Sequence, residues 1–406
     1  MPVASRCLYA LGVAAAAAAV LAAQRGTSAW SLQPRAIESP ASINSGQPQL
    51  TVSSRGVLLS WIERHGTIAS LKFSERSSSG WTAPRPVAGG DNWFVNWADV
   101  PSVMRLADGT LAAHWLEKSG ASPDAYDVRL SYSSDDGRTW AASLLPHHDG
   151  TPTEHGFASL FQMPGAGLGL VWLDGRAMKG GHEGHGDMAL RFATFDTRWK
   201  QTSDAAIDDR VCECCPTTAA LTADGPIVAY RNRDPDETRD IHVSRYENGR
   251  WTESKPVRAD GWKIQACPVN GPMLSASGRT VVLAWFTGKN DMPQAYAAFS
   301  SDAGRTFGSP MRLDDGSSIG RVDVELLPDA SALASYIEYT DRQPRFNVRR
   351  IDRSGSRSPA VTIAGLEEGR ASGYPRMARH GDEIVFAWVE RAETLQVKTA
   401  VAKLPR

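Results

Sequence analysis

Trp61-Ile-Glu63 ends a short apolar run, and its pattern of an aromatic followed two residues later by a mostly polar residue recurs along the chain. The copies are Trp61-Ile-Glu63, Trp115-Leu-Glu117, Trp172-Leu-Asp174, Tyr230-Arg-Asn232, Trp285-Phe-Thr287, Tyr336-Ile-Glu338 and Trp388-Val-Glu390. Successive copies lie 51 to 58 residues apart. This period, filled with short β-type runs and tight turns, is typical of a β-propeller. We therefore predict an all-β fold of seven blades, each a four-stranded antiparallel sheet.

A second marker, an aromatic that opens a strand just after a polar turn, repeats in step with the first. Its copies are Trp81, Trp140, Trp199, Trp251 and Phe307, followed by a degenerate sixth near Ser356. The C-terminus lacks a seventh, whereas Trp30-Ser-Leu-Gln-Pro-Arg at the other end reads like Trp81-Thr-Ala-Pro-Arg. We expect the N-terminal strand to complete the last blade, so that the ring closes without free sheet edges.

The composition supports one globular domain over residues 30–406. Glycine and proline together number 60, as many tight turns require, and no linker-like segment interrupts the repeats. The 44 basic and 45 acidic residues nearly balance, and no basic stripe is visible. This balance argues against a nucleic-acid partner.

Residues 1–29 differ from the rest of the chain. Arg6 precedes an apolar run from Leu8 to Ala23, and small residues follow at Thr27-Ser-Ala29. This pattern predicts a secretory signal peptide, and the run is short for a membrane span. We expect a protein that is exported to the periplasm or beyond, that is not an integral membrane protein once processed, and that folds in an oxidising compartment.

Two turn sequences carry a family resemblance. Ser133-Ser-Asp-Asp-Gly-Arg-Thr-Trp140 and Ser300-Ser-Asp-Ala-Gly-Arg-Thr-Phe307 both fit the pattern S-x-D-x-G-x-T-W/F. The chain thus resembles the Asp-box propellers of the sialidase superfamily, in which this box is a structural turn between the third and fourth strands of a blade. Arg210-Val-Cys-Glu-Cys-Cys-Pro216 and Gln265-Ala-Cys-Pro-Val-Asn-Gly-Pro272 look like a bacterial exported, sialidase-like subgroup. Sialidases have six blades, which makes six the family alternative to our count.

Strand direction separates two faces of the predicted ring. The turns after the first strand of each blade are short, and the Asp boxes share their face. The opposite face carries the long segments, among them 89–102, 147–159, 174–188, 208–217 and 258–270. We expect a glycan or small-molecule ligand to bind on this long-loop face, because loops on a rigid scaffold usually carry function.

Four cysteines remain after the predicted processing, and all fall on the long-loop face: Cys212, Cys214, Cys215 and Cys267. One interpretation is disulfide bonding, for which four cysteines permit three complete pairings. The other is a thiolate site for copper or zinc. His155, His182 and His185, which lie in the segments around the third blade, are candidate additional metal ligands.

A hydrolase would need different residues. The resemblance implies arginines that hold a substrate carboxylate, a tyrosine nucleophile and a carboxylic acid that protonates the leaving oxygen. The candidate catalytic residues are Arg321, Tyr374, Arg376 and Asp99, and the candidate substrate-binding residues are Arg176, Arg231 and Arg233. However, the Arg-Ile-Pro motif that supplies the first arginine of the sialidase clamp is absent.

Three hypotheses follow. The first is that the chain is a glycosidase-like enzyme acting on acidic or other glycans. This hypothesis predicts that Arg321, Tyr374 and Arg376 converge in one pocket. Alternatively, it is a non-hydrolytic propeller that binds copper or zinc through its cysteines, or a disulfide-stapled module that binds a glycan or a protein.

Overall fold

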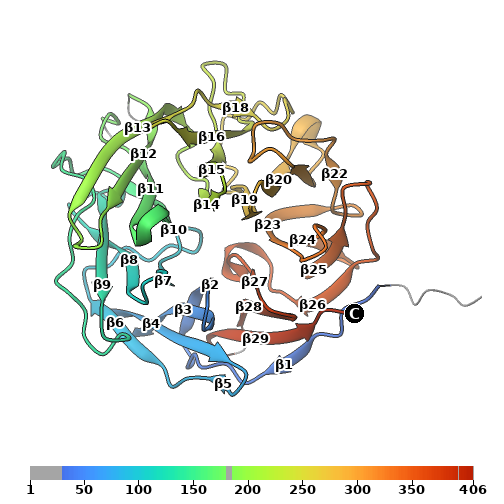
Figure 1. Ribbon diagram of the computed structural model, residues 1–406, viewed down its shortest axis with the longest axis horizontal. Coiled ribbons are helices and arrows are strands. Elements are labelled where there is room, and N and C mark those ends of the chain that lie inside the picture. The colour runs from blue at the N-terminus through green and yellow to red at the C-terminus, as the bar shows by residue number, and fades with distance from the viewer. Residues whose placement is uncertain (1–29, 180–184, 392, 406) are drawn as a thin grey trace, which may run out of the picture.

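The computed structural model describes residues 30–179, 185–391 and 393–405, and these form seven antiparallel sheets around one axis. Figure 1 shows the ring from one face, with β2, β7, β10, β14, β19, β23 and β27 innermost. The prediction of an all-β seven-bladed propeller is therefore confirmed, and the six-bladed alternative is wrong. The predicted signal segment, residues 1–29, lies outside the described residues, as does His182.

The strands follow one another blade by blade. Blade 1 contains β2 (Ser45–Ser53), β3 (Gly56–His65), β4 (Ile68–Ser77), β5 (Gly80–Trp81) and β6 (Arg85–Gly90); blade 2 contains β7 (Ser102–Arg105), β8 (Leu111–Lys118) and β9 (Tyr126–Ser133); blade 3 contains β10 (His155–Gln162), β11 (Leu168–Asp174), β12 (Met188–Phe195) and β13 (Gln201–Val211). Blade 4 contains β14 (Thr218–Thr222), β15 (Gly225–Arg231), β16 (Ile241–Glu247), β17 (Arg250–Trp251) and β18 (Lys255–Pro256); blade 5 contains β19 (Met273–Ser277), β20 (Thr280–Thr287), β21 (Gln294–Ser300) and β22 (Met311–Arg312). Blade 6 contains β23 (Ser318–Leu326), β24 (Ala332–Thr340), β25 (Gln343–Ile351) and β26 (Val361–Gly365); blade 7 contains β27 (Arg376–His380), β28 (Glu383–Arg391), β29 (Leu395–Lys403) and β1 (Arg35–Ile37). Short 3-10 helices occur at η1 (Pro164–Ala166), η3 (Lys289–Asp291) and η4 (Gly369–Ser372).

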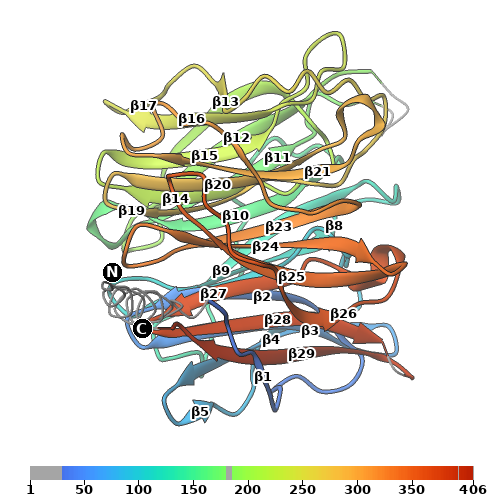
Figure 2. The same cartoon turned by 90° about the vertical axis from the view of Figure 1, so that its right-hand side faces the viewer.

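Blade 7 is built from both ends of the chain, as expected. Strand β1 pairs antiparallel with β29, with Ala36 opposite Ala400. Leu32, just before β1, is buried among residues of blades 6 and 7. Figure 2 shows the blades edge-on, with β1 beside β29. The ends therefore fasten the ring, and β29 has no free edge.

Blade 2 departs from the predicted four strands. Its sheet has three, and the fourth position is reduced to a single bridge between Leu130 and Leu144. The segment that follows, 145–154, bonds to the start of β9 through Thr153 and Glu154 and leads into β10 of blade 3. This is where the structure gathers the histidine cluster described below.

The apolar residues of each repeat pack between neighbouring blades. Val57, Leu59 and Trp61 of blade 1, for example, join a buried cluster with Val385 and Ala387 of blade 7. Because adjacent sheets cover each other in this way around the ring, the core consists of apolar layers between successive blades.

The two S-x-D-x-G-x-T turns connect the third strand to the fourth-strand position of blades 2 and 5. In the first, Ser133 Oγ accepts a hydrogen bond from the Gly137 N–H at 2.8 Å, and the Asp135 carboxylate accepts bonds from the Thr139 N–H at 2.9 Å and hydroxyl at 2.7 Å. The turn around Asp302 repeats these bonds. These side chains satisfy the backbone of their own turn.

Among the residues that the structure describes, no helix has the length and apolar character needed to cross a bilayer.

Candidate functional site

Arg321, Tyr374 and Arg376 lie close together, and of these three residues Arg376 lines the cavity along the propeller axis. The Arg321 guanidinium lies 4.6 Å from the ring of Trp97 and 6.0 Å from that of Tyr374, and the Arg376 guanidinium lies 5.5 Å from the Tyr374 ring. The rings of Trp97 and Tyr374 stack with centroids 5.8 Å apart. We call these four residues the axial plug.

Arg321 is held in place by backbone groups. Its guanidinium donates to the carbonyls of Gly373 at 3.0 Å and Gly369 at 3.1 Å, and to Ser372 Oγ at 2.6 Å. Its φ of 49° is unusual for a side-chain-bearing residue and accompanies a register break in β23. Arg321 therefore fixes the loop before β27 through three hydrogen bonds of its guanidinium.

Tyr374 is poorly suited to act as a nucleophile. Its side chain is buried, and its hydroxyl donates a hydrogen bond to the Val269 carbonyl. Burial raises the pKa of its hydroxyl far above the usual value. The hydroxyl is held protonated on a neutral acceptor, whereas a nucleophilic tyrosine needs a neighbouring base.

A cavity of about 200 Å³ follows the axis through the ring. The inner strand of every blade contributes lining residues, including Gln49, Ser102, Ser159, Thr218, Ser275, Glu325 and Arg376. Asp99 and Asp323 also line it, but each ties two blades together, because Asp99 Oδ2 accepts the Phe157 N–H at 2.7 Å and Asp323 Oδ2 accepts the Met377 N–H at 2.9 Å. Burial raises the pKa of Asp99 to about 8, and nearby Glu154 contributes.

The thiols of Cys212, Cys214 and Cys215 form a compact buried cluster. Cys212 Sγ lies 3.0 Å from Cys215 Sγ and 3.9 Å from Cys214 Sγ, and all three sulfurs lie within 4.8 Å of one another. Hydrogen bonding with Cys212, Cys215 and Cys267 raises the pKa of the Cys214 thiol, which places the exposed Cys267 beside the cluster. The four described cysteines are all unbridged.

Positive charge surrounds this thiol cluster. Arg239 donates to Cys212 Sγ at 3.4 Å and to Glu213 at 2.8 Å, and both arginine and glutamate are buried. Burial disfavours a thiolate at Cys212, but hydrogen bonds from Cys214 and Cys215, with the charges of Arg239 and Arg231, outweigh it and lower the pKa of Cys212. These contacts therefore favour the thiolate form of Cys212 over that of its neighbours.

The predicted substrate-binding arginines are engaged within the protein. Arg231 donates to the carbonyls of Asn270, Arg239 and Phe286. Arg233 pairs with Glu213 and Glu237, and Arg176 forms a two-pronged bond with Asp174 at 2.6 and 2.7 Å. They hold the loops of the long-loop face in place, and the structure does not bring them into one pocket with the axial plug.

The two cysteine-containing motifs pack against each other. A Cβ on Gly271 would lie 2.0 Å from the Pro216 carbonyl oxygen, so only glycine fits this approach. Asn270 Oδ1 accepts the Arg321 N–H at 2.7 Å. These contacts join the thiol cluster to the axial plug across blades 4, 5 and 6, so the two sites form one rigid region.

His155 does not join the thiols. Its ring stacks on that of His147 at 3.9 Å, and its nitrogens face Asp127, Asp149 and Asp174. His185 is exposed and contacts Lys179 through the backbone.

Sequence reasoning missed Trp97, Arg239 and His147. Trp97 and His147 lie in two of the long segments that the sequence did indicate, and Arg239 follows the second strand of blade 4. No spacing rule reveals these contacts, because Trp97 and His147 meet residues of neighbouring blades and Arg239 reaches Cys212 from a loop.

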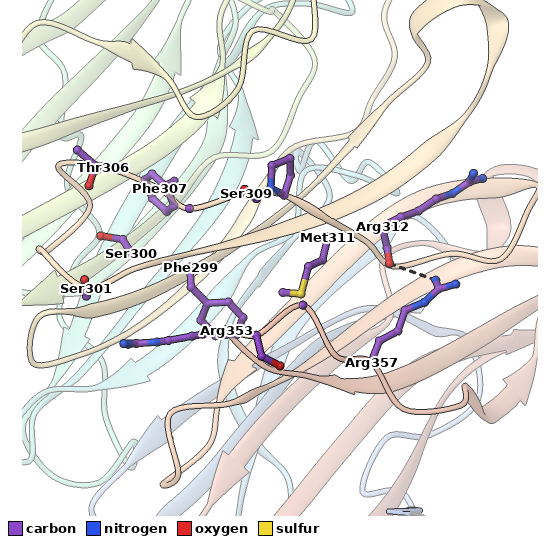
Figure 3. Close-up of a pocket in the computed structure, with 14 residues that line it drawn as sticks. Phe299, Ser300, Ser301, Thr306, Phe307, Ser309, Met311, Arg312, Arg353 and Arg357 are labelled. Atoms are coloured by element: carbon purple, nitrogen blue, oxygen red, sulfur yellow. Dashed lines mark hydrogen bonds between the residues drawn. The ribbon is translucent and has the colours of Figure 1, made fainter.

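A separate, open pocket of about 900 Å³ lies on blades 5 and 6, beside the turn at Ser300–Phe307 (Figure 3). Arg312, Arg353 and Arg357 line it, but Arg312 pairs with Asp314 at 2.7 Å and Arg357 with Asp315 at 3.1 Å. Arg357 also donates to the Arg312 carbonyl, as the dashed line in Figure 3 shows. Nearby carboxylates thus already neutralise two of its three cations.

No protein-family model and no curated protein matches the sequence. Among solved structures, the polysaccharide lyase Uly1 matches with a TM-score of 0.55 and 11% identity, covering 89% of this chain and 90% of that one. A family PL25 ulvan lyase bound to -[GlcA(1-4)Rha3S]- matches with a TM-score of 0.50 and 12% identity, covering 79% and 80%. This chain shares their propeller fold. A protein of unknown function from Dyadobacter fermentans also matches, with a TM-score of 0.52 and 13% identity over 92% and 98% of the chains. At these identities the likeness concerns the fold alone.

Proposed function

We propose that this propeller binds a soft metal ion, Cu(I) or Zn²⁺, through the thiolates of Cys212, Cys214 and Cys215. The observation that carries the proposal is the buried cluster of three sulfurs, all within 4.8 Å of one another. Thiolates at such spacing suit these ions among the biological metals.

The number of ligands distinguishes the two ions. Three thiolates are a suitable set for Cu(I), whereas structural zinc sites are almost always four-coordinate, so Zn²⁺ would need Cys267 as its fourth ligand. Arg239 and Arg231, buried beside Cys212, offset the excess negative charge of three thiolates. Binding would draw the sulfurs toward one point, since a zinc–sulfur bond is only about 2.3 Å long.

The competing state is a disulfide, most simply between Cys212 and Cys215, whose sulfurs are 3.0 Å apart. If residues 1–29 direct export, as we also propose, the compartment would favour oxidation. Arg239 favours the unbridged state, because its buried guanidinium donates to Cys212 Sγ. A disulfide would remove the thiolate charge at that sulfur.

The test is mass spectrometry of the untagged protein under native and denaturing conditions, with and without thiol alkylation. We expect one metal to be lost on denaturation and three or four thiols then to be alkylated. A metal-free chain would reject the proposal if it is lighter by four hydrogens and has no alkylatable thiol, or lighter by two hydrogens and has only two. Cys212→Ser should abolish binding of both ions, whereas Cys267→Ser should abolish only that of Zn²⁺.

A glycan-acting propeller is the second candidate, and one observation favours it: Arg321, Tyr374 and Arg376 lie close together. Two lyases with this fold act on polysaccharides, and one was solved with a uronate-containing oligosaccharide. For this chain to use the same region, the axial plug must open, because Tyr374 is buried and the Arg321 guanidinium is bonded to Gly369, Ser372 and Gly373.

Turnover of uronate-containing polysaccharides and of sialosides tests this candidate, with Tyr374→Phe as the decisive variant. Turnover that is lost in Tyr374→Phe would support it. Absence of turnover by the folded wild type would reject the glycan-acting function, and so would turnover that is unchanged in Tyr374→Phe.

A further inference from the structure

A second cluster of metal-ligand side chains lies between blades 2 and 3. His147 and Asp149 come from the segment before β10, His155 from its first residue, Asp127 from β9, and Asp174 from the end of β11. The imidazole planes of His147 and His155 are within 3° of parallel. One possible ligand set is Asp127, His147 and His155, and another is Asp149, His155 and Asp174, each with its ligand atoms within 4.8 Å of one another.

Several of these atoms are buried without a hydrogen-bond partner. They are Nε2 of His147, Nε2 of His155 and Oδ2 of Asp149, whose side chains are 3%, 0% and 8% exposed. His155 Nε2 and Asp149 Oδ2 face each other at 3.3 Å without forming a hydrogen bond, and Arg176 Nη2 lies 3.3 Å from the same Asp149 oxygen. Buried polar atoms normally have partners, so their convergence indicates a missing ligand.

The charges of the cluster are also unbalanced. It contains three carboxylates, whereas Arg176 is the one Lys or Arg side chain among the described residues that pairs with them, contacting Asp174 at 2.6 Å and Asp149 at 3.3 Å. Asp127 faces only the two imidazoles in the described ion pairs. Before the histidines are counted, the cluster carries two uncompensated negative charges, which are costly to bury and which a divalent cation would neutralise.

A route for an ion is present as well. An open pocket of about 370 Å³ is lined by His147, Asp127, His148, Gly150 and Thr151, among others. It reaches the cluster from the surface, so exchange with solvent requires no unfolding.

We propose that Asp127, His147 and His155 bind a divalent transition-metal ion, with Asp149 beside both imidazoles and with Arg176 and Trp172 holding Asp174 next to them. Imidazole and carboxylate together suit Zn²⁺ and Mn²⁺. Metal–ligand bonds are about 2.0–2.2 Å for zinc, so the two rings turn out of their stack and the ligands close around the ion. Trp172 donates to Asp174 at 2.8 Å, an outer contact of the kind that orients metal ligands.

Mn²⁺ is the decisive probe, because it prefers oxygen and nitrogen ligands and avoids the thiol cluster. The chelator-stripped full-length protein is titrated with Mn²⁺ by electron paramagnetic resonance, and its melting temperature is measured in parallel. We expect one bound Mn²⁺ per chain and a melting temperature that rises with Mn²⁺ concentration. Folded wild type that binds no Mn²⁺ would overturn the proposal and leave a proton on His155 as the compensating charge.

His147→Asn and Asp127→Asn should each weaken Mn²⁺ binding by at least about tenfold, since even outer-shell changes have effects of this size. His148→Asn is the matched control, because His148 is adjacent and lines the same pocket but bonds to Gln201. Equal weakening by His148→Asn would contradict the assignment. Asp127→Asn preserves the shape of the side chain, so it guards against a result caused by misfolding.

Discussion

The indole N–H of Trp61 donates a hydrogen bond of 2.8 Å to the buried carboxylate of Glu63, two residues later on the same strand. The same bond joins Trp115 to Glu117 and Trp172 to Asp174. The repeated aromatic–acid pattern of the sequence thus has a local physical cause in blades 1, 2 and 3. In blade 5, where Thr287 replaces the acid, Trp285 bonds instead to Asp260 from a loop.

Removing the acid should therefore destabilise the fold only where the bond exists. Glu63→Ala leaves the Trp61 N–H buried without an acceptor, and we expect a loss of about 1–3 kcal/mol in the free energy of unfolding. Glu390→Ala is the control, because Glu390 is exposed and Trp388 Nε1 has no hydrogen-bond partner, and the change should stay within about 0.5 kcal/mol. Urea denaturation measures both, and equal losses would contradict the role of the bond.

Gly137 and Gly249 allow the cost of a left-handed backbone to be separated from the cost of steric crowding by an added Cβ. Gly137 and Gly249 both have φ of 79°, but a Cβ on Gly137 would lie 2.5 Å from the Phe73 ring, whereas a Cβ on Gly249 meets nothing within 4 Å. Gly249→Ala should cost about 1–2 kcal/mol for its left-handed backbone. Gly137→Ala should cost roughly 1–3 kcal/mol more, because the core around Phe73 must shift. Thermal denaturation measures the loss of stability in both variants. Equal losses would contradict the role of the contact with Phe73.

Closure of the ring through the N-terminal segment can be tested at Leu32. Leu32→Ala should destabilise the protein by about 2–5 kcal/mol, as expected for a buried leucine, because its side chain packs against blades 6 and 7. Ile43→Ala, at a position 61% exposed, should change little. A small effect at Leu32 in denaturant titrations would show that the ring is stable without this contact.

The buried carboxyl of Asp99 predicts how stability depends on pH. Its pKa is raised by burial to about 8 in the folded protein, above its usual value of 3.8. Between about pH 4 and pH 8 the folded state retains a proton that the unfolded chain has released, so this contribution to stability falls as pH rises through that window.

Asp99→Asn should remove that part of the pH dependence, because an amide does not titrate between pH 4 and pH 8. The amide oxygen can still accept the Phe157 N–H, so the contact between the blades is kept. Asp323→Asn is the matched comparison, since burial raises the pKa of Asp323 only to about 6 and its window therefore ends earlier. Denaturant titrations from pH 4 to pH 8 check both variants. An Asp99→Asn profile parallel to that of the wild type would contradict the assignment.

The sequence by itself determined the architecture. Seven copies of Trp61-Ile-Glu63 and its relatives predicted seven blades, and the likeness of Trp30–Arg35 to Trp81–Arg85 predicted that the ends share a blade. Both predictions succeed because each repeat carries much of its own hydrogen bonding and packs mainly on its neighbours, so a period in the chain becomes a period in space.

Only the tertiary structure decided which side chains meet. Arg321 lies beside Tyr374, but the Trp97 ring also packs against it and its guanidinium is bonded to the carbonyls of Gly369 and Gly373. His155 lies with His147 and Asp127 rather than with the thiols, because the segment before β10 packs against the start of β9. Such meetings depend on how loops from different blades pack, and spacing along the chain does not encode that.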